Sequence, residues 1–270
     1  MGRNVFWIMI QKKFDNAYKW GISVFTCLMI YALWYFFTKA ELVSQTIIPS
    51  PDSVWHAFVG IVKNGYKNHS LMEHVGVSLG RLLAAFCMAM IIGAPLGLLS
   101  GFCLHVRAVV EPIIDFLKPL PPLAYYTLLV LWLGIGNSSK IVLLMMSCLP
   151  PIYIACMTAV IRIPQVYLDG AYSVGANKIQ VFLYVVTWFC FPQIITGMRT
   201  SLGVGYTTLI SAEMVAATSG IGWVVLDASR FMRSDIIFCG IFVMALTGIV
   251  MDVCLRLLEQ LMVPWANKRG

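Results

Sequence analysis

The side chains with chemical potential in this sequence interrupt long apolar runs. Glu213 ends one run, Arg199 lies earlier in the same run, and hydroxyl side chains lie between them at Thr207, Thr208 and Ser211. An ionised carboxylate is costly in lipid, so Glu213 is expected to face a bundle interior, a cavity or the membrane interface. Two interpretations of Glu213 stay open: it lines or gates a solute path, or it is an interfacial or packing-site acid.

Arg199 and the hydroxyl residues also have two interpretations each. The guanidinium of Arg199 could attract an anion, or the side chain could extend to the cytoplasmic surface. Thr207, Thr208 and Ser211 form a polar stripe that suits a wet path, but such hydroxyls also bond back to their own helix. These four residues and Glu213 are the candidate pathway residues.

Catalytic, metal and nucleotide chemistry are not indicated. The four histidines form no His-x-x-x-His pair, and the eight cysteines form no Cys-x-x-Cys pair. The sequence has no Gly-x-x-x-x-Gly-Lys-Ser/Thr loop and no Gly-x-Ser-x-Gly elbow. We therefore expect no catalytic residue, no metal site and no cofactor bound by this chain. ATP would have to be hydrolysed by another protein.

One further group shares a helix face. His74, Ser78 and Arg81 are spaced by four and then three residues, which places their side chains on the same side of a helix. By spacing alone, this arrangement is typical of a solvated or interface face.

The composition identifies the solvent in which these residues act. Hydrophobic residues make up 60% of the 270 residues and charged residues 11%, whereas soluble domains carry roughly 25% charged residues. Because this small number of charged residues cannot cover a water-facing surface, we predict an integral membrane protein. The net charge of +7 is spread over loops and tails. We interpret it as membrane anchoring and a topology signal, not as a nucleic-acid site.

The apolar runs predict an all-α, polytopic transmembrane helix bundle with about six spans. The predicted spans are approximately 21–37, 82–104, 123–136, 140–160, 192–214 and 235–255. The third span covers only about 21 Å, which is short of a hydrocarbon core of roughly 30 Å. It is therefore either extended by residues 113–117 or part of a broken helix.

Small residues and prolines set the expected packing and breaks. Gly93, Gly97 and Gly101 are four residues apart and would let another helix approach closely. Pro121 and Pro122 close the segment 105–122, which we interpret as a loop, because prolines break a helix there. An amphipathic helix is expected near residues 54–62, and Pro150-Pro151 is expected to kink the fourth span.

The distribution of Lys and Arg predicts the orientation. With segment 1–20 in the cytoplasm, the loops 105–122 and 161–191 and the basic tail 256–270 also lie inside. These inside segments carry eleven Lys and Arg, and the outside segments carry seven. If the short third span does not cross, every later segment changes sides.

The segment 161–191 is too polar for lipid and too long for a simple connection. Pro164 suits the first turn of a helix, and Gly175 suits the left-handed turn that ends one. We predict a short helix lying crosswise between two spans. A surface helix that rests on the bilayer is the alternative.

This segment resembles the EAA loop of ABC importer permeases. The family pattern is Glu-Ala-Ala, three residues, Gly, and later an apolar residue before Pro; here it reads Asp169-Gly170-Ala171-Tyr172-Ser173-Val174-Gly175 and Phe191-Pro192. Ala171 and Gly175 match, whereas Asp169, Gly170 and Phe191 are replacements. The resemblance implies that this helix docks on a separate ATPase. The implied ATPase-coupling residues are Asp169, Gly170, Ala171, Ser173 and Gly175.

Further motifs resemble the taurine, sulfonate and nitrate branch of that family, and the taurine permeases most. They run from about residue 45 to the end and include Lys118-Pro-Leu-Pro-Pro-Leu-Ala, Leu131-Trp-Leu-Gly-Ile-Gly, Ser139-Lys140-Ile141, Gly203-Val-Gly-Tyr, Ala212-Glu213-Met214 and His74-x3-Ser78-x2-Arg81.

The resemblance implies a permease subunit in the bacterial inner membrane, in two copies around a central path. Two ABC ATPase subunits, holding ATP and Mg, and a periplasmic solute-binding protein would be its partners. Taurine or another alkanesulfonate is the expected solute, and nitrate, bicarbonate or another small solute is the alternative. An ion-coupled secondary transporter is the rival class, but it predicts paired midplane acids and inverted repeats that are not evident.

Overall fold

The computed structural model describes residues 2–264, and within that range the chain is all helical with no strand. Of the predicted basic tail 256–270, residues 256–264 are described, whereas Lys268 and Arg269 lie outside the described residues. The helices are α1 (Gly2–Lys39), α2 (Pro51–Asn64), α3 (Leu71–Phe102), α4 (Leu104–Leu117), α5 (Pro122–Leu133), α6 (Asn137–Ile161), α7 (Gln165–Ser173), α8 (Lys178–Gln180), the π-helix η1 (Val181–Val186), α9 (Thr187–Ala216), α10 (Ile221–Arg230) and α11 (Ser234–Met262).

Five helical segments are long and apolar enough to cross a membrane. They are Gly21–Lys39, Leu71–Phe102, Asn137–Ile161, Lys178–Ala216 and Ser234–Met262. A sixth crossing is formed if α4 and α5 count as one span, and these two helices meet at an angle of 100°. The predicted all-α transmembrane bundle is therefore confirmed, with the third span broken in two.

Two boundaries lie earlier in the chain than predicted. α3 begins at Leu71 because Ser70 caps it: the Glu73 N–H donates to the Ser70 hydroxyl at 3.2 Å, and the Ser70 N–H donates to the Glu73 carboxylate at 2.8 Å. The fifth span begins at Lys178, because α8, η1 and α9 form one run. The Thr187 backbone N–H donates to the Phe182 carbonyl five residues earlier, as expected of a π-helix, and the Thr187 hydroxyl donates to the same carbonyl at 3.0 Å.

The interpretation of residues 105–122 as a loop is wrong. Residues Leu104–Leu117 form α4, and Pro112 lies inside this helix. The prolines break the chain only after Leu117, between α4 and α5. An apolar face of α4 is stabilised by the bundle, since buried Ile114 packs with Tyr153 and Met157 of α6. The amphipathic helix near 54–62 is α2.

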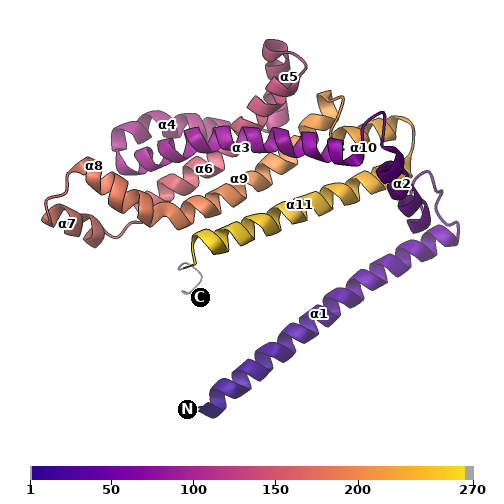
Figure 1. Cartoon of the computed structure of the whole chain (residues 1–270), viewed down its shortest axis with the longest axis horizontal. Helices are drawn as coiled ribbons and strands as arrows, with labels where there is room; N and C mark the ends of the chain where they lie inside the picture. The colour runs from indigo at the N-terminus through magenta and orange to yellow at the C-terminus, as the bar shows by residue number, and fades with distance from the viewer. Residues whose placement is uncertain (1, 265–270) are drawn as a thin grey trace.

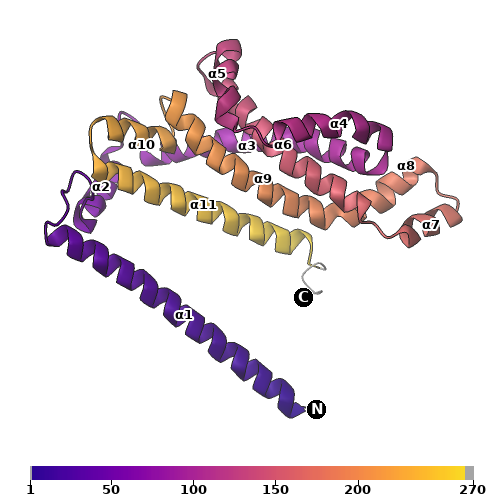
Figure 2. The ribbon, with the colours of Figure 1, turned by 180° about the vertical axis from the view of Figure 1, so that it is seen from behind.

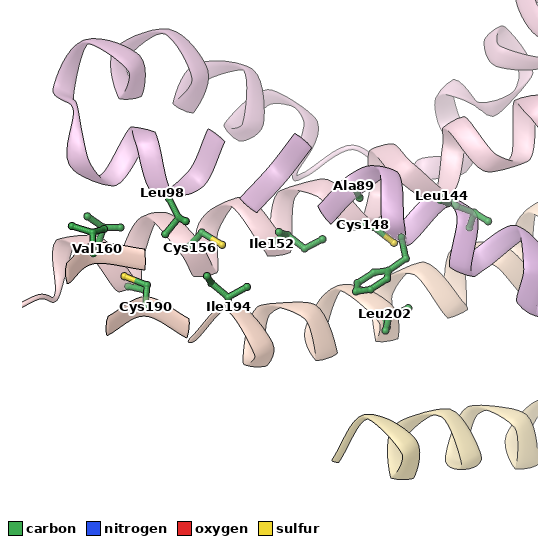
Figure 3. Close-up of a cluster of buried hydrophobic side chains, with 14 of the residues drawn as sticks. Ala89, Leu98, Leu144, Cys148, Ile152, Cys156, Val160, Cys190, Ile194 and Leu202 are labelled. Carbon is green, nitrogen blue, oxygen red and sulfur yellow. The ribbon is translucent and has the colours of Figure 1, made fainter. Parts of the chain in front are cut away.

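The centre of the bundle is the packing of α6 between α3 and α9 (Figures 1 and 3). Gly97 of α3 lies so close to α6 that a Cβ atom there would lie 2.6 Å from the Tyr153 carbonyl oxygen. Gly205 of α9 lies similarly close to Cys148 of α6. Because these glycines have no side chain, the three helices pack closely around a continuous apolar core.

The direction of these contacts shows where the broken span goes. Gly93 touches Ile152 of α6, and eight residues later Gly101 touches Val160, eight residues after Ile152. α3 and α6 therefore run parallel, and the chain must return between them. The α4–α5 pair makes that return, so α3 and α6 run in the same direction through the bundle.

The two ends of the bundle are consequently different. In Figures 1 and 2, α7, the N-terminal end of α1 and the C-terminal end of α11 lie toward one end, and α2 and α10 lie toward the other. α1 meets the bundle near its C-terminal end, where Trp34 stacks on Phe238 of α11 with ring centroids 5.9 Å apart. Its indole N–H donates to the Pro49 carbonyl at 3.0 Å.

The packing of α3 on α6 leads to a first prediction. Gly97→Ala places a methyl group against the Tyr153 backbone and is expected to lower the unfolding free energy by roughly 1–3 kcal/mol. Gly80→Ala, on the same helix but with nothing within 4 Å of the added Cβ, is the control and should be neutral or slightly stabilising. Thermal unfolding of the detergent-solubilised variants checks this, and equal midpoints would contradict it.

Candidate functional site

α7 is the most accessible of the predicted functional elements. None of its residues is buried, and Val166 and Val174 at its two ends are 79% and 85% exposed. The Gly170 and Gly175 positions have open space where a Cβ would stand. The predicted short crosswise helix therefore presents a face with no partner among the described residues.

Contacts on its other side hold α7 to the bundle. Leu168 and Ala171 pack on the central core, and the Tyr167 ring lies 5.5 Å from the Phe189 ring of α9. Gly175 adopts φ +86°, a backbone conformation that favours glycine, and its N–H donates to the Tyr172 carbonyl at 2.9 Å. The position of α7 relative to α9 is thus fixed by packing and by a tight turn.

Two polar side chains of α7 are engaged within the helix. The Gln165 amide donates to Asp169 at 3.2 Å, and the Ser173 hydroxyl donates to the Asp169 backbone carbonyl at 2.8 Å. The carboxylate of Asp169 still lies on an exposed turn, where it is free to accept hydrogen bonds from another protein.

The structure places the candidate pathway residues at three locations: a small cavity between α5 and α9, the contact between α9 and α11, and a buried polar network around Glu213. Thr207, Thr208 and Ser211 line a cavity of about 210 Å³ together with Pro121 and Pro122 at the start of α5. Each of the three hydroxyls also donates to a carbonyl of α9, at 2.9 to 3.0 Å. Their oxygen atoms nevertheless remain able to accept hydrogen bonds from a solute or water.

Arg199 lies elsewhere and forms ion pairs with α11. Its Nε donates to Asp252 at 2.8 Å, and one of its terminal nitrogens lies 3.9 Å from Glu259. Asp252 also binds Arg256 at 2.8 Å. Sequence reasoning missed these partners, since the acids lie more than fifty residues further along the chain.

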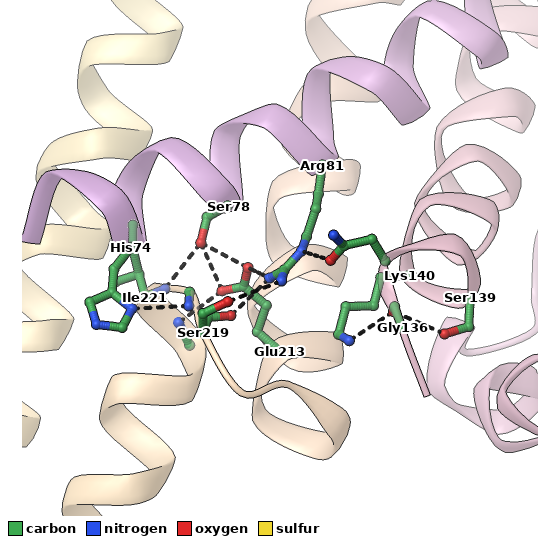
Figure 4. A network of polar contacts seen from close by, with 12 residues as sticks. His74, Ser78, Arg81, Gly136, Ser139, Lys140, Glu213, Ser219 and Ile221 are labelled. Atoms are coloured by element: carbon green, nitrogen blue, oxygen red, sulfur yellow. Dashed lines mark hydrogen bonds and ion pairs between the residues drawn. The ribbon is translucent and has the colours of Figure 1, made fainter. Parts of the chain in front are cut away.

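Glu213 lies in a buried polar network (Figure 4). Its carboxylate accepts hydrogen bonds from Arg81 at 2.8 Å, from the Ser78 hydroxyl at 2.8 Å and from the Gly222 N–H at 3.0 Å. The side chain is 1% exposed, so the charge is balanced entirely by groups of the protein. Glu213 does not line either of the cavities next to α9.

Arg81 extends the network to two further segments. Its Nε donates to the side chain of Asn137, the first residue of α6, at 2.8 Å. A terminal nitrogen donates to the Ser219 carbonyl at 2.9 Å. One guanidinium therefore connects α3 with α6, α9 and the loop before α10.

Two glycines at the start of α10, Gly220 before its first residue and Gly222 in its first turn, allow the backbone to approach Glu213. Gly220 has φ +125°, and a Cβ at this position would overlap the Glu213 carboxylate. A Cβ at Gly222 would lie 2.7 Å from the Ile210 carbonyl. The backbone can approach the carboxylate and donate to it only because both positions are glycine.

His74 supports the turn from α3. The Gly220 N–H donates to His74 Nδ1 at 3.1 Å, so Nδ1 is an acceptor and the ring is in its neutral form with the proton on Nε2. Nε2 lies 3.2 Å from the Tyr66 carbonyl, which accepts that proton. The ring also stacks on Trp223, with centroids 5.8 Å apart.

The interpretation of His74, Ser78 and Arg81 as a solvated or interface face is wrong. These residues are 0%, 1% and 6% exposed. The sequence placed them on one face but did not reveal the acceptors that make their burial possible, because Glu213 and the turn at 219–222 lie more than 130 residues away. Burial of such groups requires that each be hydrogen-bonded.

A second buried cation was also missed. Lys140 is 3% exposed, and its ammonium donates to the Gly136 carbonyl at 2.9 Å. Among the described residues, no group of three or more His, Cys, Asp and Glu side chains is arranged so that it could hold a metal ion.

The network leads to a second prediction. Glu213→Ala leaves the Arg81 guanidinium buried without its counter-charge and is expected to cost roughly 3–5 kcal/mol of unfolding free energy. Asp252→Ala removes a half-exposed pair and should cost roughly 0–1 kcal/mol. Unfolding of the purified variants measures both values. A Glu213→Ala variant as stable as Asp252→Ala would show that the pair does not stabilise the fold.

Comparison with solved structures supports this architecture. The chain is similar to the permease chain in inward-facing structures of the MetNI methionine ABC transporter, with a TM-score of 0.60 over 70% of this chain and 94% of that chain. The identity is 15%, so this comparison shows the fold alone. The fold is that of a type I importer permease.

Curated relatives are more similar in sequence. The taurine transport system permease protein of Escherichia coli (strain K12) is 34% identical over 245 residues, covering 90% of this chain and 89% of that protein. A putative aliphatic sulfonates transport permease protein of the same strain is 34% identical over 250 residues, covering 92% and 94%. The nitrate import permease protein of Synechocystis sp. is 28% identical over 227 residues, covering 82% of each.

A family model covers most of the region described above. The model of the binding-protein-dependent transport system inner membrane component matches residues 93–264, which include α7, Glu213 and the turn before α10. The chain therefore belongs to this family and is a permease subunit of an ABC importer.

Proposed function

We propose that this permease imports taurine or a closely related alkanesulfonate, driven by ATPase subunits that bind α7. The observation that carries the coupling role is the exposed face of α7, with open space at Gly170 and Gly175, on a helix held to α9 by packing. The similarity to taurine and sulfonate permeases over at least 90% of the chain supports the solute class. Nitrate, carried by a relative at lower identity, is the alternative, with bicarbonate less supported.

The proposed assembly contains two copies of this permease, two ATPase subunits that hold ATP and Mg, and a periplasmic binding protein. α7 would lie on the cytoplasmic side. The N-terminal end of α1 and the C-terminal end of α11 lie at the same end of the bundle as α7 (Figure 1), so the N-terminal segment would also be cytoplasmic. The bundle end with α2 and α10 would then receive the binding protein.

Coupling follows from the connection between α7 and α9. Only the short turn at residues 174–177 separates α7 from α8, and α8, η1 and α9 then form the fifth span without a break. A displacement of α7 by the ATPase is therefore transmitted to α9, and with it to the cavity lined by Thr207 and Ser211. Rigid-body motion of packed helices is an established way to alternate access.

A third prediction tests the coupling helix. Gly170→Trp inserts a large ring into the exposed face of α7, where the permease itself has open space, so the variant should fold but lose its ATPase partner. Gly76→Trp, an equally open glycine on α3 near the other end of the bundle, is the matched control. Co-purification from membranes should fall at least about tenfold for Gly170→Trp only, corresponding to about 1.4 kcal/mol of binding free energy. Retained ATPase would refute the coupling role of α7.

A fourth prediction tests the solute class. In proteoliposomes that contain the permease, its ATPase and its binding protein, ATP should drive uptake of radiolabelled taurine. Excess alkanesulfonate should compete, and equimolar nitrate should not. Competition by nitrate at lower concentration than by alkanesulfonates would favour the alternative solute, and uptake without the ATPase would favour a secondary transporter.

A further inference from the structure

We propose that a groove between the α4–α5 break, α6 and α9 binds the solute through the ammonium group of Lys118 and two free backbone carbonyls of α6. This inference rests on the proposed function, because it names the part of the permease that would recognise a sulfonate with an amino group.

The groove begins as a cavity of about 500 Å³. Its walls are the residues around the α4–α5 break, the middle of α6 and the first half of α9. Pockets that hold small molecules measure roughly 300–1,000 Å³, so this volume suits a small solute with its water.

A second cavity continues the groove along the same helix face. Thr196, Thr200 and Val204 of α9 line the larger cavity, and Thr207 and Ser211 line the smaller one. Successive members of this series are three or four residues apart, which places them on one face of α9. Pro122 borders both cavities, so the two form one groove over several turns of α9.

Lys118 supplies the charge of the groove. It is the one Lys, Arg, Asp, Glu or His among the described residues that line the two cavities. It is exposed, and no acidic side chain within the described residues forms an ion pair with it. Arg199 lies on the same span as the groove but is neutralised by Asp252. A sulfonate or another small anion would therefore be attracted to Lys118.

The prolines of α6 leave hydrogen-bond acceptors unpaired at the α6 wall of the groove. Pro150 and Pro151 have no N–H, so the carbonyls of Met146 and Ser147 receive no ordinary helical hydrogen bond from them. All four residues line the larger cavity. Two adjacent carbonyls without helical partners suit a solute ammonium group, because a charged donor forms the stronger hydrogen bonds.

The combination of a cation and a carbonyl pair matches a zwitterion. Taurine has a sulfonate at one end and an ammonium group at the other, and ethanesulfonate is the same molecule without the amine. We therefore expect a change at Lys118 to affect the transport of both solutes, and a change at the carbonyls of α6 to affect the transport of taurine alone.

The fifth prediction measures ATP-driven uptake in proteoliposomes with one binding protein that delivers both solutes. Lys118→Gln should lower kcat/KM for taurine and for ethanesulfonate about tenfold or more, because a charge-assisted hydrogen bond is lost. Lys118→Arg should restore most of it. Arg256→Gln, which removes an exposed basic side chain of α11 that lines neither cavity, is the control and should leave uptake of both solutes unchanged.

Pro151→Ala restores an N–H donor to the Ser147 carbonyl. It should lower the ratio of taurine to ethanesulfonate uptake several-fold, because only taurine carries the ammonium group that would donate to the Ser147 carbonyl. Pro112→Ala restores a donor inside α4, away from the groove, and should leave the ratio unchanged.

The outcomes separate the two proposals. If the wild type transports but Lys118→Gln transports equally well, or if Pro151→Ala leaves the ratio unchanged, the groove assignment is overturned and the importer function stands. If the wild type shows no ATP-driven uptake of either sulfonate, the proposed solute class fails and the groove assignment with it. ATPase stimulation by the binding protein, measured in the same vesicles, verifies that each variant is assembled.

Discussion

The arrangement of this permease depends on one buried carboxylate. Glu213 is removed from water, and its hydrogen-bond donors lie outside α9: Arg81 and Ser78 belong to α3, and the Gly222 backbone N–H belongs to α10. Since an unpaired buried charge is strongly destabilising, these segments must stay together whenever the carboxylate is ionised. The bundle end that faces away from α7 is therefore held as one unit.

Different faces of α9 have different roles as a result. Gly205 and the Ser201 hydroxyl, which donates to the Cys148 carbonyl at 2.8 Å, hold α9 against α6. The face with Thr200 and Thr207 is left open along the groove. At the other end of α9, η1 and α7 connect this helix to the surface at which the ATPase is proposed to bind. A helix that is clamped at one end, packed along one face and displaced at its other end can change the groove without unfolding the core.

The charges follow the same division. Arg81 and Arg199 are both neutralised by carboxylates, one inside the bundle and the other between α9 and α11. These two arginines therefore stabilise the packing of the helices. Lys118 and the carboxylate of Asp169 are left for contacts outside the fold, the first in the groove and the second on α7.

The sequence by itself determined the number and approximate location of the membrane spans, since about twenty apolar residues in a row leave few alternatives. It also identified α7, because Gly175 and the residues before it carry a local turn and a recognisable pattern. It could not identify α4, because the apolar face of this helix is stabilised only by long-range packing, in which Ile114 of α4 contacts residues of α6. Nor could it show the burial of His74, Ser78 and Arg81, or the role of Gly220, because the group they all serve lies far away in the chain. Only the tertiary structure brings Glu213 to them, and buried polar groups can be understood only together with their partners.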